Sequence, residues 1–283
     1  MRVPLLLLAG MVVAISSAQS PFKLMGDAAP MDGGCIQLTP DVPYSEGLAY
    51  STQKLNLNTY FEIQFDIYLG TKEEGADGIT FVVHNDPNQY QAFGTWGECM
   101  GYGRWSKDYV AGNYISPSVA VEFDTYYNAR QNDPYCDHAA YLENGTNFHT
   151  QYWNNNTDNY NLEDGKLHDF RFRWNPEKQL ITVFLDGHIV YSGKKDLIHE
   201  VFKGATQVIW GFTASTGRAS NLQYFCLKQI AVYKIPSRAV KPVKPAIPNL
   251  TLQTAPKMDH NQAAISEVTS VQTPRLDQVP LLR

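Results

Sequence analysis

The residues best suited to chemistry lie close together in the stretch 119–138, which reads VAVEFDTYYNARQNDPYCDH. Five of its side chains offer oxygen or nitrogen ligands for a metal: Glu122, Asp124, Asn128, Asp133 and His138. Glu122 and Asp124 are separated by one residue in strand-like sequence, so both carboxylates lie on one face of the strand. The polar loop that follows can fold back and bring Asn128 and Asp133 to Asp124.

These carboxylates would repel one another at short range unless a cation lies between them. An all-oxygen set of Asp124, Asn128, Asp133 and a backbone carbonyl suits calcium. A set that contains an imidazole, namely Glu122, Asp124, Asp133 and His138, suits manganese or another divalent transition metal. Asp124 and Asp133 belong to both sets and can bridge two ions. An ExD pair followed by Asn is by itself an ordinary acidic surface loop, whereas the full order of ligands is much more specific.

The elements that must position these ligands are predicted to be strands. From about residue 34 to 233, short β-branched and aromatic runs are separated by Gly, Pro, Asn and Asp. This pattern predicts an all-β antiparallel sandwich, and the one helix expected is Asp196–Phe202, capped by Asp196. The predicted strands are 35–39, 47–51, 59–70, 77–85, 118–125, 138–143, 147–153, 166–174, 179–187, 188–193, 206–216 and 222–235.

The order of ligands resembles the metal-binding loop of the legume-type (L-type) lectins, and the resemblance covers roughly residues 24–234. It implies a concanavalin A-like jelly-roll sandwich for residues 19–235. It also implies that the transition metal, Mn²⁺ in the family, is held by Glu122, Asp124, Asp133 and His138. The same resemblance implies that Ca²⁺ is held by Asp124, Asn128, Asp133 and the carbonyl of Tyr126. Cys136, inside the loop, departs from the plant pattern.

Further stretches match the family in the right order at 75–83, 94–97 and 211–221. Ala76-Asp77 matches the family's cis-bonded pair, whose Asp accepts hydrogen bonds from sugar hydroxyls; taken alone, Asp77 is a turn residue. Trp96 departs from the small residues usual there, and it either stacks on a second sugar ring or covers a disulfide at Cys99. The amide of Asn128 would bind calcium through its oxygen and point its NH₂ at the sugar. The residues implied for carbohydrate binding are Asp77, Gly97, Tyr126, Asn128, Thr216 and Gly217.

These features predict a lectin that binds glycans or glycoproteins without catalysis. Related sandwich glucanases carry a third carboxylate in an ExDxxE run, and Tyr127 stands at that position here. Glycoside hydrolysis needs two carboxylates that flank the bond, and those here are committed to metal. The alternative is an extracellular structural or matrix protein that uses the fold as a scaffold; a glycoside hydrolase is a weaker one. Family members often assemble through the back sheet, so the resemblance also allows a homo-oligomer.

The two ends of the chain have their own compositions. Residues 1–18 predict a secretory signal peptide, with Arg2 before an apolar run and small residues before the cleavage point. That run is too short for a comfortable membrane span and no other run would span one, so we expect a secreted, extracellular protein. Residues 236–283 are Pro-rich and lack aromatic residues, which predicts a flexible tail. The net charge of −5 gives no reason to expect nucleic acid as a partner.

The four cysteines of a secreted chain allow up to two disulfides. We expect Cys99 to pair with Cys136, because both lie in loops expected near the metals. Cys35 and Cys226 would then tie the first strand to the last, although an unpaired or intermolecular cysteine is also open. Sequons for N-glycosylation, meaningful only in a host that glycosylates, begin at Asn144, Asn155 and Asn249.

Overall fold

The computed structural model describes residues 21–105, 112–148, 151–153 and 161–233. The predicted signal peptide (1–18), the predicted tail (236–283) and the sequons at Asn155 and Asn249 lie outside the described residues. The chain divides into two compact units, Met1–Pro236 and Ser237–Arg283, and the description below concerns the first. No helix among its described residues combines the length and apolar character that a membrane crossing requires.

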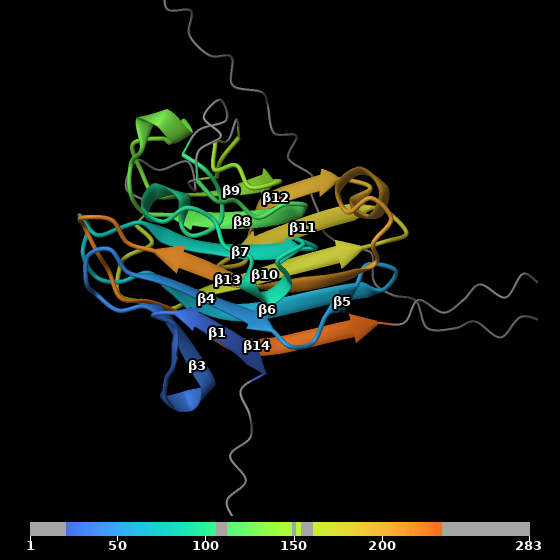
Figure 1. The fold of residues 1–283 in the computed structure, drawn as a ribbon, viewed down its shortest axis with the longest axis horizontal. Helices are drawn as coiled ribbons and strands as arrows, with labels where there is room; N and C mark the ends of the chain where they lie inside the picture. Colours follow the sequence, from blue (N-terminus) through green and yellow to red (C-terminus); the bar gives the residue numbers. More distant parts are fainter. Residues whose placement is uncertain (1–20, 106–111, 149–150, 154–160, 234–283) are drawn as a thin grey trace, which may run out of the picture. The chain divides into compact units, whose positions relative to one another are not determined.

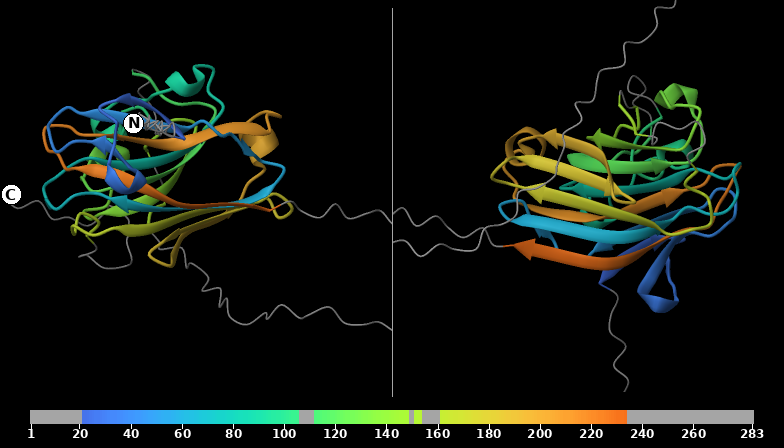
Figure 2. Two further views of the ribbon diagram at one scale, coloured as in Figure 1. Left: turned by 90° about the horizontal axis from the view of Figure 1, so that it is seen from below. Right: turned by 180° about the vertical axis from the view of Figure 1, so that it is seen from behind.

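Two antiparallel sheets face each other as layers (Figures 1 and 2), which confirms the predicted jelly-roll sandwich. The front sheet has the order β1-β4-β13-β7-β8-β9, with β5 paired to β13. Its strands are β1 (Phe22–Gly26), β4 (Glu46–Ser51), β5 (Leu55–Asn56), β7 (Gly78–His84), β8 (Ser118–Asp124), β9 (His138–Glu143) and β13 (Gln207–Ser215). The back sheet has the order β12-β11-β10-β6-β14-β3-β2. Its strands are β2 (Ala29–Pro30), β3 (Cys35–Thr39), β6 (Tyr60–Tyr68), β10 (His168–Asn175), β11 (Leu180–Leu185), β12 (His188–Lys194) and β14 (Gln223–Tyr233).

Helical structure in the described part is confined to single turns. The predicted helix is present as a π-helical turn, η5 (Leu197–Val201), and the Asp196 side chain caps it by accepting the N–H of His199 at 3.1 Å. The 3₁₀ turns are η1 (Asp32–Gly34), η2 (Gln89–Gln91), η3 (Gly97–Cys99) and η4 (Ala129–Gln131). The predicted strand 147–153 was wrong: among its described residues, Trp153 forms an isolated bridge with Ala139. Strands β1, β2 and β5 were not predicted.

The main core lies between the two sheets and follows from alternation along the strands. In β6, every second residue from Phe61 to Ile67 is buried, and the residues between them are half-buried on the outer face. Phe65 lies at the centre of a cluster of aromatic rings, with centroid distances from 4.7 to 6.0 Å. Its partners there are Phe81, Phe170, Trp210, Phe212 and Phe225.

A second, smaller core covers the other face of the front sheet. It contains Tyr50, Val82 and Ala120 of the sheet, and Ala92, Tyr102 and Ile115 from the connection between β7 and β8 pack with them. The buried hydroxyl of Tyr50 donates to the carbonyl of Ala92 at 2.8 Å, so the polar atom under the connection is satisfied. Strand β7 is therefore buried on both faces, as its nearly continuous apolar sequence predicted.

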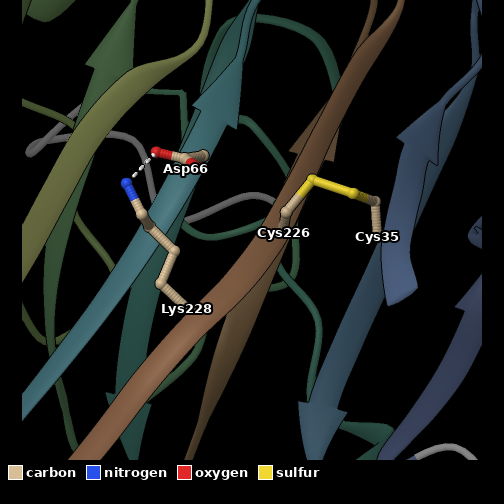
Figure 3. Close-up of a disulfide and its surroundings, with 4 residues drawn as sticks. All are labelled: Cys35, Asp66, Cys226 and Lys228. Carbon is tan, nitrogen blue, oxygen red and sulfur yellow. Dashed lines mark hydrogen bonds and ion pairs between the residues drawn. A yellow bond between two sulfur atoms is a disulfide. The ribbon is translucent and has the colours of Figure 1, made fainter. Parts of the chain in front are cut away.

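The structure contains one of the two predicted disulfides in its described part. Cys35 and Cys226 lie directly opposite each other on β3 and β14 and are joined (Figure 3). The predicted Cys99–Cys136 disulfide was wrong, and both residues retain their thiols. Cys99 is fully buried in η3, where its sulfur faces the side-chain nitrogen of Gln131 at 3.8 Å, whereas Cys136 is only half-buried.

Candidate metal and carbohydrate site

Four neighbouring strands of the front sheet bring the predicted site residues to one edge of the sheet, the edge formed by the ends of these strands. The register places Ser215 of β13 opposite Gly78 of β7, Gly78 opposite Asp124 of β8, and Asp124 opposite His138 of β9. The matching stretches 75–83, 119–138 and 211–221, which are far apart in sequence, therefore meet where these strands begin or end. In Figure 1 this edge lies at the arrowhead of β13.

The metal ligands predicted from the sequence converge at this edge. Asp124, Asp133 and His138 each offer a ligand atom, and these atoms all lie within 4.8 Å of one another. Nε2 of His138 lies 3.9 Å from both Oε1 of Glu122 and Oδ1 of Asp133. That separation is too long for a hydrogen bond and is suited to ligands that share one ion.

Surrounding groups orient two of these ligands. Nδ1 of His138 lies 3.2 Å from the carbonyl oxygen of Cys136. When Nδ1 donates a hydrogen bond there, Nε2 keeps the free lone pair that a metal requires. Nδ2 of Asn147 donates to Oε2 of Glu122 at 3.0 Å. Asn147 was missed by the sequence analysis, because it lies beyond the metal loop and its partner is 25 residues away.

The chemistry of this donor set fits the two cations. Burial, and then the charges of Asp133 and Glu122, raise the pKa of Asp124 well above its ordinary value, because the carboxylates repel one another. The side-chain oxygen of Asn128, Oδ1, is buried and accepts no hydrogen bond from any described residue. Glu122, Asp124, Asp133 and His138 would hold a transition metal, and Asp124, Asn128 and Asp133 would hold calcium. The Tyr126 carbonyl as a calcium ligand stays a prediction.

Asp77 lies beside the metal ligands and is joined to Ala76 by a cis peptide bond, as the family resemblance implied. Its side chain is buried, with the residue 4% exposed, and Oδ2 has no hydrogen-bond partner among the described residues. Burial and then the charge of Glu98 raise the pKa of Asp77 to about 7, and the N–H of Gly217 partly offsets that rise. The carboxylate can therefore accept further hydrogen bonds from a ligand.

The loop after β13 contributes Gly217 but not the side chain of Thr216. A Cβ at Gly217 would lie 3.4 Å from Oδ2 of Asp77, so glycine leaves that carboxylate uncovered. Thr216 is 0% exposed, and its hydroxyl donates to the carbonyl of Val42 at 2.8 Å and accepts the N–H of Ser45 at 2.9 Å. Thr216 was predicted as a sugar contact, but its buried side chain instead fixes the shape of the loop.

Glu98 is a further residue of the site that the sequence analysis missed. It is buried beside the metal loop, where Nε of Arg130 lies 2.7 Å from Oε1 and Nε2 of Gln131 donates to Oε1 at 2.9 Å. Nδ2 of Asn128 lies 3.4 Å from Oε2, so the NH₂ group that we predicted to point at a sugar faces Glu98. Its neighbour Gly97 has open space at the Cβ position.

Exposed aromatic rings surround this edge. Trp96 is 55% exposed and Tyr126 is 43% exposed. Tyr127 and Tyr135, both on the metal loop, stack at a centroid distance of 4.2 Å. Because Cys99 forms no disulfide, the suggestion that Trp96 covers one is excluded, and its ring is available to stack on a ligand.

Solved structures of plant lectins share this fold. Basic winged bean lectin, solved with Tn-antigen, has 22% identity and a TM-score of 0.61, with 76% of this chain and 94% of that chain covered. Lectin II from Ulex europaeus has 19% identity and a TM-score of 0.62, with the same coverage. Lectin I-B4 from Griffonia simplicifolia, in a metal-free form, has 21% identity and a TM-score of 0.60, covering 78% of this chain and 96% of that one.

The family model described as the legume lectin beta-barrel domain matches residues 13–229. This match spans most of the chain, including every strand of the front sheet and every residue assigned above to the candidate site. The fold and the converging metal ligands agree with this match. The chain belongs to the legume (L-type) lectin family.

Proposed function

We propose that the protein is a metal-dependent lectin that binds glycans without catalysing a reaction on them. The observation that carries the proposal is the row of residues at one sheet edge, where the metal ligands Asp124 and His138 lie next to Gly78 and Asp77. One end of the sheet thus combines a set of cation ligands with a buried carboxylate that still has hydrogen-bonding capacity.

Each group of residues in the proposed site would have a separate role in binding. When bound, the ions would neutralise the converging carboxylates and fix the loop 124–138. Asp77 would accept hydrogen bonds from sugar hydroxyls, since charged acceptors form the stronger bonds. The backbone of Gly97 would donate to a sugar oxygen, and the exposed ring of Tyr126 would pack on the apolar face of the pyranose. Such a shallow, wet site favours weak single-site affinity, near the millimolar range. Tighter overall binding would then come from several sites that are presented together.

Several features favour binding over hydrolysis. The carboxylates Glu122, Asp124 and Asp133 point toward one another and toward His138, so they are committed to an ion rather than placed on either side of a glycosidic bond. Tyr127 occupies the position of the third carboxylate of the related glucanases and is exposed. The proposed ligands are therefore glycans or glycoproteins, not a substrate that is cleaved.

The disulfide between Cys35 and Cys226 supports an oxidising compartment, and with the predicted signal peptide it favours a secreted, extracellular protein. N-glycosylation remains a proposal at Asn144, which is exposed after β9. Assembly through the back sheet also remains a proposal.

A glycan array and a sugar column, each run with Ca²⁺ and Mn²⁺ and with EDTA, test the proposed function. We expect retention that requires the ions and disappears in Asp77→Asn with the thermal transition intact. Asp86→Asn is a matched control, because Asp86 is also a buried aspartate but lies beyond the other end of β7. Equal retention with and without EDTA would favour a scaffold protein, and release of reducing sugar would favour a hydrolase; either result would refute the proposal.

A further inference from the structure

A cleft lies at the end of the front sheet opposite to the metal and carbohydrate site. Its volume is about 720 Å³, a size at which small-ligand pockets are common. Its lining includes Asn85 after β7, Ser116 before β8, Asn144 after β9, and residues of the segment 200–205 between η5 and β13. The register pairs β7 with β8 over seven residues, so about 20 Å of strand separate the cleft from the metal site.

Asn144, in the wall of this cleft, is the first residue of the sequon Asn144-Gly145-Thr146. Its backbone N–H donates to the carbonyl of Ser118 at 2.9 Å, and its Oδ1 accepts the N–H of Ser118 at 3.2 Å. These two bonds hold the exposed side chain in place. Its Nδ2, the atom to which an N-linked glycan is joined, makes no hydrogen bond with any described residue.

The rest of the lining offers groups that suit a sugar. The carboxylate of Glu200 is held toward the end of β9, because Nζ of Lys195 lies 3.3 Å from Glu200 and 3.1 Å from Glu143. Lys203 is exposed, and its ammonium group pairs with no described carboxylate. Phe202 also lines the cleft although it is only 2% exposed, so the inner part of the cleft is apolar. Donors and acceptors around an apolar surface match the hydroxyl and acetamido groups of an N-acetylated sugar.

We propose that the protein carries an N-linked glycan at Asn144 and that the first sugars of this glycan lie in the cleft, against Glu200, Lys203 and Phe202. Attachment makes the contact intramolecular, so weak hydrogen bonds are sufficient to keep the sugars in place. In the glycosylation step, Nδ2 forms a bond to C1 of the first sugar and gives up one proton. The bond that breaks joins C1 to the lipid diphosphate that carried the oligosaccharide.

The proposal rests on the N-glycosylation of Asn144 proposed above and is independent of the lectin function. The test is secretion of the full chain from a cell that N-glycosylates, followed by mass spectrometry of each glycopeptide. A peptide N-glycosidase then releases the glycans from the native protein in EDTA, which removes any contribution of the metal centre. We expect an occupied Asn144 whose glycan is released slowly, because sugars in the cleft are shielded from the enzyme.

A variant of the lining measures this shielding. Glu200→Ala/Lys203→Ala removes two charged partners, and the Asn144 glycan should then be released about ten times faster, the factor given by two lost hydrogen bonds of ordinary net strength. Lys166→Ala/Glu177→Ala is the matched control, because both residues are exposed, lie outside the cleft and leave the net charge unchanged in the same way. We expect the control to keep the rate of the unaltered protein.

A glycan on an open turn provides the reference rate. Asp186→Asn/His188→Thr creates the same Asn-Gly-Thr sequence in a turn of similar conformation, with φ of 49° and 81° against 54° and 72° at Asn144-Gly145. A Cβ at Gly187 would meet open space, so we expect rapid release there. An unoccupied Asn144, release at the rate of the open turn, or equal rates in the lining variant and its control would each overturn the proposal. Thermal unfolding of each variant confirms that folded proteins are compared.

Discussion

The disulfide between Cys35 and Cys226 should contribute a large part of the stability of the sandwich. It joins facing residues of β3 and β14 and closes a loop across a sequence separation of 191 residues (Figure 3). Replacing both cysteines by alanine removes the cross-link with little loss of packing, because the neighbours Ile36 and Phe225 are the residues buried in the core.

The magnitude follows from the length of the loop. In the chain-entropy model, closing a loop of this size stabilises the folded state by about 5 kcal/mol at 25 °C, and measured disulfides more often give about 2–4 kcal/mol. Because small domains have a total free energy of unfolding of about 5–15 kcal/mol, we expect the Cys35→Ala/Cys226→Ala double variant to lose about 3–5 kcal/mol.

Urea unfolding followed by tryptophan fluorescence measures this loss. Wild-type protein in a reducing agent should match the double variant, and the double variant should be insensitive to the same agent. Cys136→Ser is the control for removing a cysteine outside the disulfide. A loss of less than about 1 kcal/mol would refute the reasoning, because the unfolded chain would then not be restrained by the loop.

Further predictions concern pH, the site and the ions. Burial lowers the pKa of His84 from 6.5 to about 4. As the pH falls, the unfolded chain therefore takes up this proton before the folded chain does. The free energy of unfolding should fall by about 3 kcal/mol as the pH is lowered from 6.5 to 4. His84→Gln should flatten that dependence in urea titrations, and an unchanged slope would contradict the assignment. Glu98→Ala should weaken sugar binding about tenfold by calorimetry, since Asn128 and Arg130 lose a charged partner; an unaltered affinity would exclude Glu98 from the site. EDTA should lower the melting temperature in scanning calorimetry, because ions at 100 times their Kd contribute about 2.7 kcal/mol, and the same transition with and without chelator would argue against the metal centre.

The sequence predicts those parts of the fold that depend on local periodicity. Alternation along 59–70 predicts the inward face of β6, and the unbroken apolar run at 77–85 predicts a strand covered on both faces. Strand β1 escapes prediction because its sequence, FKLMG, is short and mixes polar with apolar residues. The run 147–153 is rich in aromatic residues and is wrongly predicted as a strand, since no local signal shows whether a neighbouring strand offers a pairing partner.

In the candidate site too, the residues that are close in sequence are predicted and those that meet through long-range contacts are not. The metal ligands lie within one short stretch, so their order in the sequence is sufficient to find them. Glu98 meets Asn128, Arg130 and Gln131 across separations of 30 to 33 residues, and no spacing rule predicts such a contact. The burial of Thr216 depends in the same way on Val42 and Ser45, which are more than 170 residues away.

The backbone explains why sugar binding should depend on ions that Asp77 does not itself bind. Thr125, the residue between the metal ligand Asp124 and Tyr126, donates its N–H to the carbonyl of Asp77 at 3.1 Å, and the N–H of Asp77 bonds to Ser215 at 3.1 Å. An ion that fixes Asp124 would therefore fix Thr125, and through the hydrogen bonds of Thr125 it would fix the peptide of Asp77, whose carboxylate we propose to bind sugar. Loss of the ion would leave the metal loop with mutually repelling acids, and a displacement of Asp124 would disturb the neighbouring hydrogen bond from Thr125 that holds Asp77.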